Sequence, residues 1–255
     1  MRDFRNVAIF GGLAAAFALA GLAQAQTPGA PPPPPASLLA TPAVGQPAES
    51  TGCVPMGLFR AVVRNVTPGL QAADRQAQPR TYYRQGAKLM RSEEQPDPSS
   101  GAQNIVIVAE PDIWVLNVVA RQAQHGVDPG PDLDVHAPIL PPSLDTPESF
   151  RTLEFGCETV FVATYAPRQQ RMVQWGGTVA ALHAVTVGDQ SLAILMDQRR
   201  NQPLMISYIR RGQPVLVLRY DDYRLGQPER PQLFAAPKGY KISESKGPPA
   251  TFSLN

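Results

Sequence analysis

Residues and motifs that support catalysis are scarce in this sequence. It contains only two cysteines, and its three histidines, His125, His136 and His183, are far apart. The motifs G-x-S-x-G, H-E-x-x-H and G-x-G-x-x-G and the phosphate-binding P-loop are all absent. The sequence therefore predicts a protein that is not an enzyme and that needs no cofactor and no metal.

A strong excess of charge of one sign is also lacking. The formal net charge is +2, and acidic and basic residues are interspersed. The two basic pairs, Arg199-Arg200 and Arg210-Arg211, flank a predicted strand, which puts them roughly 20 Å apart at about 3.3 Å per residue. They cannot form one basic patch, so we expect no nucleic-acid partner.

The two cysteines, Cys53 and Cys157, lie about a hundred residues apart, and we expect them to form one disulfide in an oxidising compartment. In the chain-entropy model, closing so long a loop stabilises the fold by about 4 to 5 kcal/mol. A thiol nucleophile or a metal-binding pair is the alternative, although no C-x-x-C spacing is present.

The apolar run Val7–Leu22 is short for a membrane span of about 20 residues, which leaves an uncleaved membrane anchor as the less favoured alternative to a cleaved leader. The run Val7–Leu22 follows Arg2 and Arg5 and precedes Ala23-Gln24-Ala25, which is the pattern of a cleaved signal peptide. We expect residues 1–25 to be that peptide and the Pro-rich residues 26–50 to be an extended, disordered linker. Residues 51–241 are predicted to form one domain, followed by a tail at residues 242–255.

Helical patterns are rare, and most of the domain is predicted to be strands. In Pro203–Tyr240 the strands are apolar on both faces, which indicates a sheet that is covered on one face and lines something on the other. The run Val160–Tyr165 is predicted to be a strand. Asp221, Asp222 and Tyr223 are interpreted as the solvated end of the last long strand.

The best candidate helix is Pro147–Phe155, with Thr146 as N-cap and Gly156 as its stop. Its Phe150 and Leu153 fall on one face and can plug an open sheet. The predicted fold class is mainly β (α+β), with roughly nine to eleven strands in a curved antiparallel sheet that must close or curl to protect its edges. We expect an unclosed half-barrel whose concave face is plugged by a few short helices; a two-sheet sandwich is the rival.

One stretch has the spacing of a metal site. In DPGPDLDVH, alternate acids and an imidazole could meet an ion. The simpler interpretation is a solvated loop rich in turn-forming residues. The residues concerned are Asp128, Asp132, Asp134 and His136.

A ligand cavity in such a sheet is expected to be walled by large apolar side chains. Trp114, in DIWVLNVV, is a candidate for this wall, although such residues are more often simply core residues. The predicted lining consists of Trp114, Leu116, Phe150, Leu153, Met196, Met205, Leu216 and Leu218.

Three stretches carry a resemblance to a known family. Tyr82–Arg91, Asn104–Leu116 and Leu233–Tyr240 are similar to strand motifs of LolA/LolB-like exported proteins of Gram-negative bacteria. The resemblance is discontinuous across Leu58–Tyr240 and rests on short motifs. The cysteine pair, the proline linker and the Asp128–Pro142 stretch are not part of the pattern.

The resemblance implies an unclosed antiparallel barrel covered by short helices, with a hydrophobic cavity that accepts lipoprotein acyl chains. On this basis we expect a periplasmic, monomeric binding or carrier protein whose partners are lipid or lipoprotein acyl chains. The alternative is a structural or interaction module of the envelope, which fills its own cavity with Phe150, Leu153 and Trp114 and binds another envelope protein. Fold alone does not decide between them.

Overall fold

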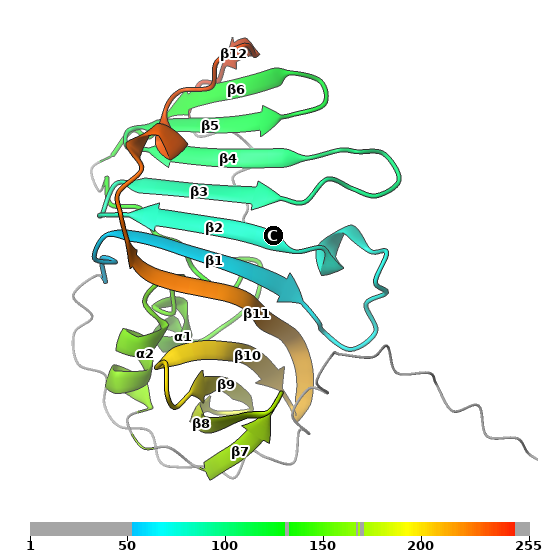
Figure 1. Cartoon of the computed structure of the whole chain (residues 1–255), viewed down its shortest axis with the longest axis vertical. Helices are drawn as coiled ribbons and strands as arrows, with labels where there is room; N and C mark the ends of the chain where they lie inside the picture. Colours follow the sequence, from blue (N-terminus) through cyan, green and yellow to red (C-terminus); the bar gives the residue numbers. More distant parts are fainter. Residues whose placement is uncertain (1–52, 131–132, 167, 169–170, 248–255) are drawn as a thin grey trace, which may run out of the picture. The chain divides into compact units, whose positions relative to one another are not determined.

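The computed structural model describes residues 53–130, 133–166, 168 and 171–247. In this part of the chain twelve strands form one sheet, in the order β12-β6-β5-β4-β3-β2-β1-β11-β10-β9-β8-β7 (Figure 1). The order does not return to its start, so the curved sheet is an unclosed half-barrel. This confirms the predicted fold class. The predicted leader and linker at residues 1–50 lie outside the described residues, as does the end of the predicted tail.

Most strands follow one another as hairpins, and neighbouring strands are antiparallel except for the parallel pair β12 and β6. Strand β11 returns to the middle of the sheet, where it pairs with β1. The strands are β1 (Leu58–Asn65), β2 (Arg80–Gln85), β3 (Leu89–Glu94), β4 (Asn104–Ala109), β5 (Asp112–Asn117), β6 (Gln122–Val127), β7 (Arg171–Trp175), β8 (Thr178–Val187), β9 (Gln190–Asp197), β10 (Gln202–Arg210), β11 (Gln213–Gln227) and β12 (Lys241–Glu244).

Both faces of the sheet are apolar, and they pack differently. We call the face that packs against residues 133–166 the inner face; it carries Val63, Tyr82 and Ile206 in the largest buried cluster. Successive side chains of a strand alternate between faces. Two smaller clusters therefore lie on the outer face, one on β8 to β11 and one on β1 to β6. Burial on both faces explains the two-sided apolar pattern of Pro203–Tyr240.

Residues 133–166 fill much of the inner face. They contain the helices α1 (Glu148–Arg151) and α2 (Glu158–Tyr165), which lie on the side toward which β8, β9 and β10 curl in Figure 1. Phe150 and Leu153 are fully buried in the inner cluster, as the predicted plug requires. The predicted helix Pro147–Phe155 is nevertheless too long. Residues 153–155 instead run antiparallel to residues 137–139, with hydrogen bonds from Ile139 N to Leu153 O and from Phe155 N to Ala137 O.

The predicted strand Val160–Tyr165 is wrong, because this segment is helix α2. Its β-branched and aromatic residues favour a strand locally, but tertiary contacts override such propensities. Cys157, just before the helix, is fixed by a disulfide. Phe161 and Val162 pack into the inner cluster. A helix that begins after Cys157 is compatible with both the disulfide and this packing.

The C-terminal residues cross the outer face. After β11, the 3₁₀ helix η3 (Pro231–Phe234) packs on β3 and β4, and Phe234 is buried among Ile107 and Leu116. Arg91 Nη1 donates a hydrogen bond to Leu233 O at 3.0 Å. The chain then reaches the far edge of the sheet as β12, beside β6 (Figure 1). Phe234–Tyr240 is thus a clasp over the sheet, and β12 takes in the first residues of the predicted tail.

The acids of β11 do not mark the end of that strand, contrary to the sequence interpretation. Strand β11 continues to Gln227, and Tyr223 is buried on the inner face. Asp222 pairs with Arg60 of β1, and Asp221 accepts from Arg64 Nε at 3.1 Å. These outer-face ion pairs join the two strands that bring distant parts of the chain together.

No described helix is long and apolar enough to cross a membrane.

Candidate ligand cavity and the buried charges that hold its wall

A cavity of about 370 Å³ lies between the inner face of the sheet and the segment Ile139–Leu144. Its floor is formed by β1, β2 and β11, and the 3₁₀ helix η2 (Arg75–Ala77) with the residues after it contributes one side. The volume falls within the range of roughly 300 to 1,000 Å³ that is typical of small-molecule sites. The space that remains between residues 133–166 and the inner face is therefore large enough for a ligand.

The lining of the cavity has an apolar and a polar part. The apolar part comes from the floor strands and the covering segment, with Val63, Tyr82, Ile139, Pro141, Leu144, Phe155, Val215, Leu216 and Leu218. The polar part consists of Asn65, Gln76, Gln78, Arg80 and Ser143. A mostly apolar wall with a few convergent polar groups is what binding sites for small molecules have in common.

The local sequence explains why these side chains meet. In β1, Ala61, Val63 and Asn65 alternate onto the inner face, and in β2 Arg80, Tyr82 and Arg84 do the same. Strands β2, β1 and β11 are direct neighbours, with Arg80 opposite Val63. Asn65 is opposite Leu218 on the other side. The floor is thus polar toward β2 and apolar toward β11.

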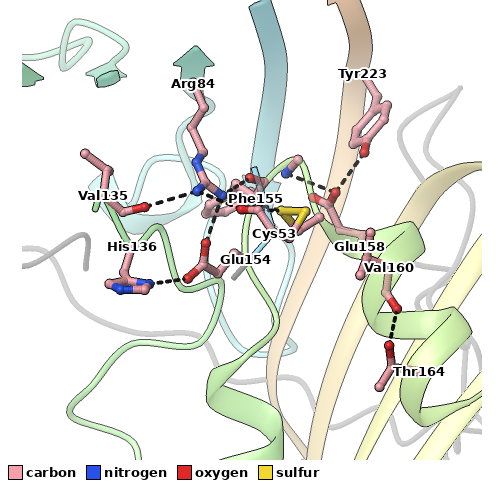
Figure 2. The surroundings of a disulfide bond; sticks show 12 residues. Cys53, Arg84, Val135, His136, Glu154, Phe155, Glu158, Val160, Thr164 and Tyr223 are labelled. Carbon is pink, nitrogen blue, oxygen red and sulfur yellow. Dashed lines mark hydrogen bonds and ion pairs between the residues drawn. A yellow bond between two sulfur atoms is a disulfide. The ribbon is translucent and has the colours of Figure 1, made fainter. Parts of the chain in front are cut away.

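Residues 133–166, which pack on the inner face, are held to the sheet by Arg84. The side chain of Arg84 is 2% exposed. Its Nη1 lies 2.9 Å from Glu154 Oε2 and donates to Phe155 O at 2.8 Å. Its Nη2 donates to Val135 O at 3.1 Å (Figure 2). One guanidinium from β2 therefore binds two backbone carbonyls and a carboxylate of the segment that roofs the inner face.

Charge on Arg84 is costly at this position. Burial lowers the pKa of its guanidinium, and the carboxylate of Glu154 raises it in opposition. Glu154 in turn accepts a hydrogen bond from His136 Nδ1 at 2.8 Å. A buried charge is tolerated when it is paired and hydrogen-bonded, and both Nη atoms of Arg84 have such partners in Glu154 and the carbonyls, whereas its buried Nε has none.

A second buried acid, Glu158, lies at the start of α2 and is fully covered. It accepts hydrogen bonds from Tyr220 Oη at 2.7 Å and from Tyr223 Oη at 2.8 Å. The backbone N–H of Gly156 donates to it at 3.0 Å. Burial raises the pKa of the Glu158 carboxyl, against the effect of these three donors. These contacts hold α2 against β11, which is the neighbour of β1, the middle strand of the cavity floor.

The disulfide between Cys53 and Cys157 confirms the predicted pairing. It lies beside Arg84, whose Nη2 is 3.5 Å from Cys53 O and whose Nη1 is 3.7 Å from Cys157 Sγ (Figure 2). It joins the residues that precede β1 to the residue just before α2. The disulfide, Arg84 and Glu158 thus fix the same stretch, residues 153–158, to the sheet.

The predicted lining residues are not all brought together. Phe150, Leu153, Met196 and Leu218 belong to the inner cluster, and Leu216 packs against it. Of these, Leu216 and Leu218 line the cavity. Met205, Trp114 and Leu116 belong to the two outer-face clusters. Trp114 stacks on His125, with ring centroids 4.0 Å apart.

Several lining residues were not expected from the sequence. Val63 alternates with its neighbours as inner residues should, yet the pattern does not say which face of a strand is the inner one. Ile139 and Leu144 lie in a proline-rich stretch with no strand or helix periodicity. Arg80 and Tyr82 precede a recognisable glycine turn. Their alternation with Arg84 indicates that the three side chains share one face of the strand.

The stretch predicted as a possible metal site is a turn at its start. Asp128 Oδ1 accepts from Gly130 N at 2.9 Å, and His136 binds Glu154. Asp132 lies outside the described residues. Within the described ranges, no group of three or more His, Cys, Asp or Glu side chains is arranged to hold a metal ion.

No family model matches the sequence, and no curated protein matches it. Among solved structures, the chain is similar to an uncharacterized conserved protein from Thermus thermophilus, at 13% identity and a TM-score of 0.43 over 74% of this chain and 91% of that one. It is also similar to MucB in the MucA/MucB complex of Pseudomonas aeruginosa, at 12% identity and a TM-score of 0.30 over 73% and 58%. A domain from Vibrio parahaemolyticus named for outer membrane lipoprotein sorting matches at 9% identity and a TM-score of 0.25 over 70% and 89%.

Proposed function

We propose that this protein is an exported, non-enzymatic binding or carrier protein that holds the acyl chain of a lipid or lipoprotein in the cavity beneath Ile139–Leu144. The observation that carries the proposal is the cavity of about 370 Å³ with aliphatic side chains from β1 and β11 on its floor. An aliphatic chain that enters it removes apolar surface from water on both partners, which is favourable. The disulfide supports an oxidising compartment such as the periplasm.

The inner face limits how much ligand can enter. Phe150, Leu153, Phe155 and Phe161 are buried there, so the protein fills most of the concavity with its own side chains. The ligand is therefore a single chain or a short part of one, located over β1, β2 and β11 beside η2. A carrier that opened its whole concave face would have to displace α1 and α2, which the Arg84 and Glu158 contacts oppose.

The same self-filling favours a second candidate, an interaction module of the envelope that carries no lipid. The two candidates differ in one measurable property, the binding of an apolar chain. Native mass spectrometry of gently purified protein tests it, with co-purified lipid expected for the carrier. Repeated recovery of lipid-free protein that also ignores a fluorescent fatty acid leaves the interaction module.

Binding is expected to depend on chain length in a defined way. Each methylene buried contributes about 0.8 kcal/mol, or about a fourfold gain in affinity. In displacement of a fluorescent fatty acid, affinity should rise by this factor per methylene and level off when the cavity is full. A flat series would contradict burial of the chain.

Val215→Phe should lower the chain length at which the affinity stops rising. Val215 is a half-buried lining residue of β11, and the larger ring takes space that the chain needs. We expect the longest chain that binds the native protein to lose roughly tenfold in affinity, the equivalent of one to two methylenes. Val179→Phe is the matched control, since Val179 is an exposed strand residue on β8. Thermal unfolding checks that both variants are folded. Equal affinities of the two variants for the longest chain would contradict the cavity as the binding site.

A further inference from the structure

His125 of β6 lies between two carboxylates near the edge of the sheet that β12 covers. Its Nε2 is 2.8 Å from Asp112 Oδ1 on β5, and its Nδ1 is 2.7 Å from Glu244 Oε2 on β12. The imidazole ring also stacks on Trp114. Each ring nitrogen of His125 therefore has a carboxylate as its partner, and the two carboxylates come from different strands.

The protonation state of His125 decides whether both contacts can be hydrogen bonds. An ionised carboxylate only accepts hydrogen bonds, and a neutral imidazole has a single N–H to donate. The protonated imidazole has two, so it can donate to Asp112 and Glu244 at once. In the neutral form, one ring nitrogen presents a lone pair to a carboxylate oxygen, and that contact becomes repulsive. The arrangement is complete only while His125 is protonated.

The surroundings of His125 favour its protonated form. Burial lowers its pKa, but the hydrogen bonds and charges of Asp112 and Glu244 raise it by more, so the pKa lies above the ordinary value of 6.5. The basic residue of β12, Lys241, lies at the other end of the strand pairing, opposite Gln122. Because the pKa is raised on folding, the stabilisation is fully present below the ordinary value and is lost as the pH rises through the raised one.

Strand β12 is a short edge strand. It has four residues, all of them exposed, and within the described part of the chain it pairs on one side only, with β6. The pairing is parallel, which is slightly less stable per residue than an antiparallel one. Lys241 N donates to Arg121 O at 2.8 Å at its start, and Ser245 N donates to His125 O at 2.7 Å just after its end. Short, exposed segments of this kind open at a low free-energy cost, so one side-chain contact can shift the opening equilibrium.

We propose that Asp112, His125 and Glu244 form a pH-sensitive latch, which holds β12 on the edge of the sheet while His125 is protonated and lets the strand open when His125 loses its proton. Opening leaves β6 as the edge strand, with unpaired backbone N–H and C=O groups to which a further strand can pair. None of the three latch residues lines the cavity, so this inference does not depend on the proposed function.

The test measures amide hydrogen exchange of Lys241 and Ser245 by NMR on the full-length protein, at about pH 5.5 and about pH 8.5, on either side of the ordinary histidine pKa. Protection factors correct the rates for the intrinsic effect of pH. We expect protection to fall about threefold between the two pH values, a size typical of one exposed ion pair. The midpoint of the fall should coincide with the pKa of His125, read from the chemical shifts of its ring protons. In His125→Gln, which cannot titrate, protection should stay constant.

Asp112→Asn tests whether competition between two acceptors is the cause. The asparagine amide can donate to Nε2 of a neutral His125, which then donates its own proton to Glu244. The fall in protection with pH should therefore disappear, and protection at about pH 8.5 should exceed that of the native protein at the same pH. Glu244→Gln should abolish the fall for the same reason, at a side chain that is 73% exposed and not needed for folding. Glu148→Gln, at an exposed position on α1, is the control and should leave the fall unchanged.

Three results would overturn the latch. The first is protection of β12 in the native protein that does not change with pH, and the second is a pKa of His125 at or below its ordinary value. The third is a fall with pH that persists in both Asp112→Asn and Glu244→Gln. Thermal unfolding of each variant shows that the comparison is made between folded proteins.

Discussion

Arg84→Met is expected to lower the free energy of unfolding by about 3 to 5 kcal/mol, the usual cost of removing one partner from a buried ion pair. The substitution keeps an apolar chain in place of the arginine stem, so most of the packing is retained. It leaves the Glu154 carboxylate without its guanidinium, and the carbonyls of Val135 and Phe155 without that donor. Urea unfolding followed by circular dichroism measures the loss.

Arg64→Met on the outer face is the matched control. Arg64 pairs with Asp221, but the two side chains are 36% and 26% exposed, and such pairs contribute only about 0 to 1 kcal/mol. We expect a clearly smaller loss of unfolding free energy in Arg64→Met than in Arg84→Met. Similar losses would mean that Arg84 does no more than a surface ion pair.

A double-mutant cycle separates the ion pair from the other contacts of Arg84. If Glu154→Gln is combined with Arg84→Met, the double variant should lose less than the sum of the single losses, because the carboxylate that lost its guanidinium is then absent. Strict additivity would show that the carbonyl contacts of Arg84, and not Glu154, account for its effect.

The second large effect is expected from the disulfide. Replacing both cysteines in Cys53→Ser/Cys157→Ser should lower the free energy of unfolding by about 4 to 5 kcal/mol, because the bond closes a loop spanning 104 residues and restricts the unfolded chain. The measurement is urea unfolding of the oxidised native protein beside the double variant.

Reduction provides the control for the double substitution. A reductant such as dithiothreitol should move the unfolding midpoint of the native protein toward that of the double variant and leave the variant unchanged. If the reductant has no effect on the native protein at complete reduction, which mass spectrometry of alkylated cysteines can verify, the bond does not stabilise the fold. The effect of Arg84→Met should also change in the double variant, since Arg84 contacts both cysteine residues.

Both effects concern the wall of the cavity. Arg84 and the disulfide fix residues 153–158, and residues 153–155 in turn pair with residues 137–139. Ile139 begins the stretch that covers the cavity, and Phe155 belongs to its lining. The polar contacts of Arg84 and the disulfide therefore hold the residues next to the cavity lining against the sheet.

Much of the sheet could be predicted from the sequence because its features are local. The strand Leu58–Asn65 coincides with β1, and Gln85-Gly86 begins the turn between β2 and β3. Alternating side chains and glycine turns specify such hairpins within a few residues. The disulfide could be predicted because the sequence offers only two cysteines.

What the sequence did not reveal depends on contacts between distant segments. Helix α2 forms despite a strand-like sequence because Cys157 is fixed and Phe161 must reach the inner cluster. Trp114 and Leu116 were expected in the cavity but lie on the outer face, because alternation separates two faces without stating which one is concave. The role of Arg84 was equally hidden, since its partners lie 31 to 73 residues away in the chain.

The most direct test of the account is a crystal structure of the protein with a fatty acid that carries bromine at the end of its chain. We predict an anomalous bromine peak between β11 and Ile139–Leu144. A bromine peak elsewhere on the protein, or a cavity without ligand in crystals grown at saturating fatty acid, would contradict it.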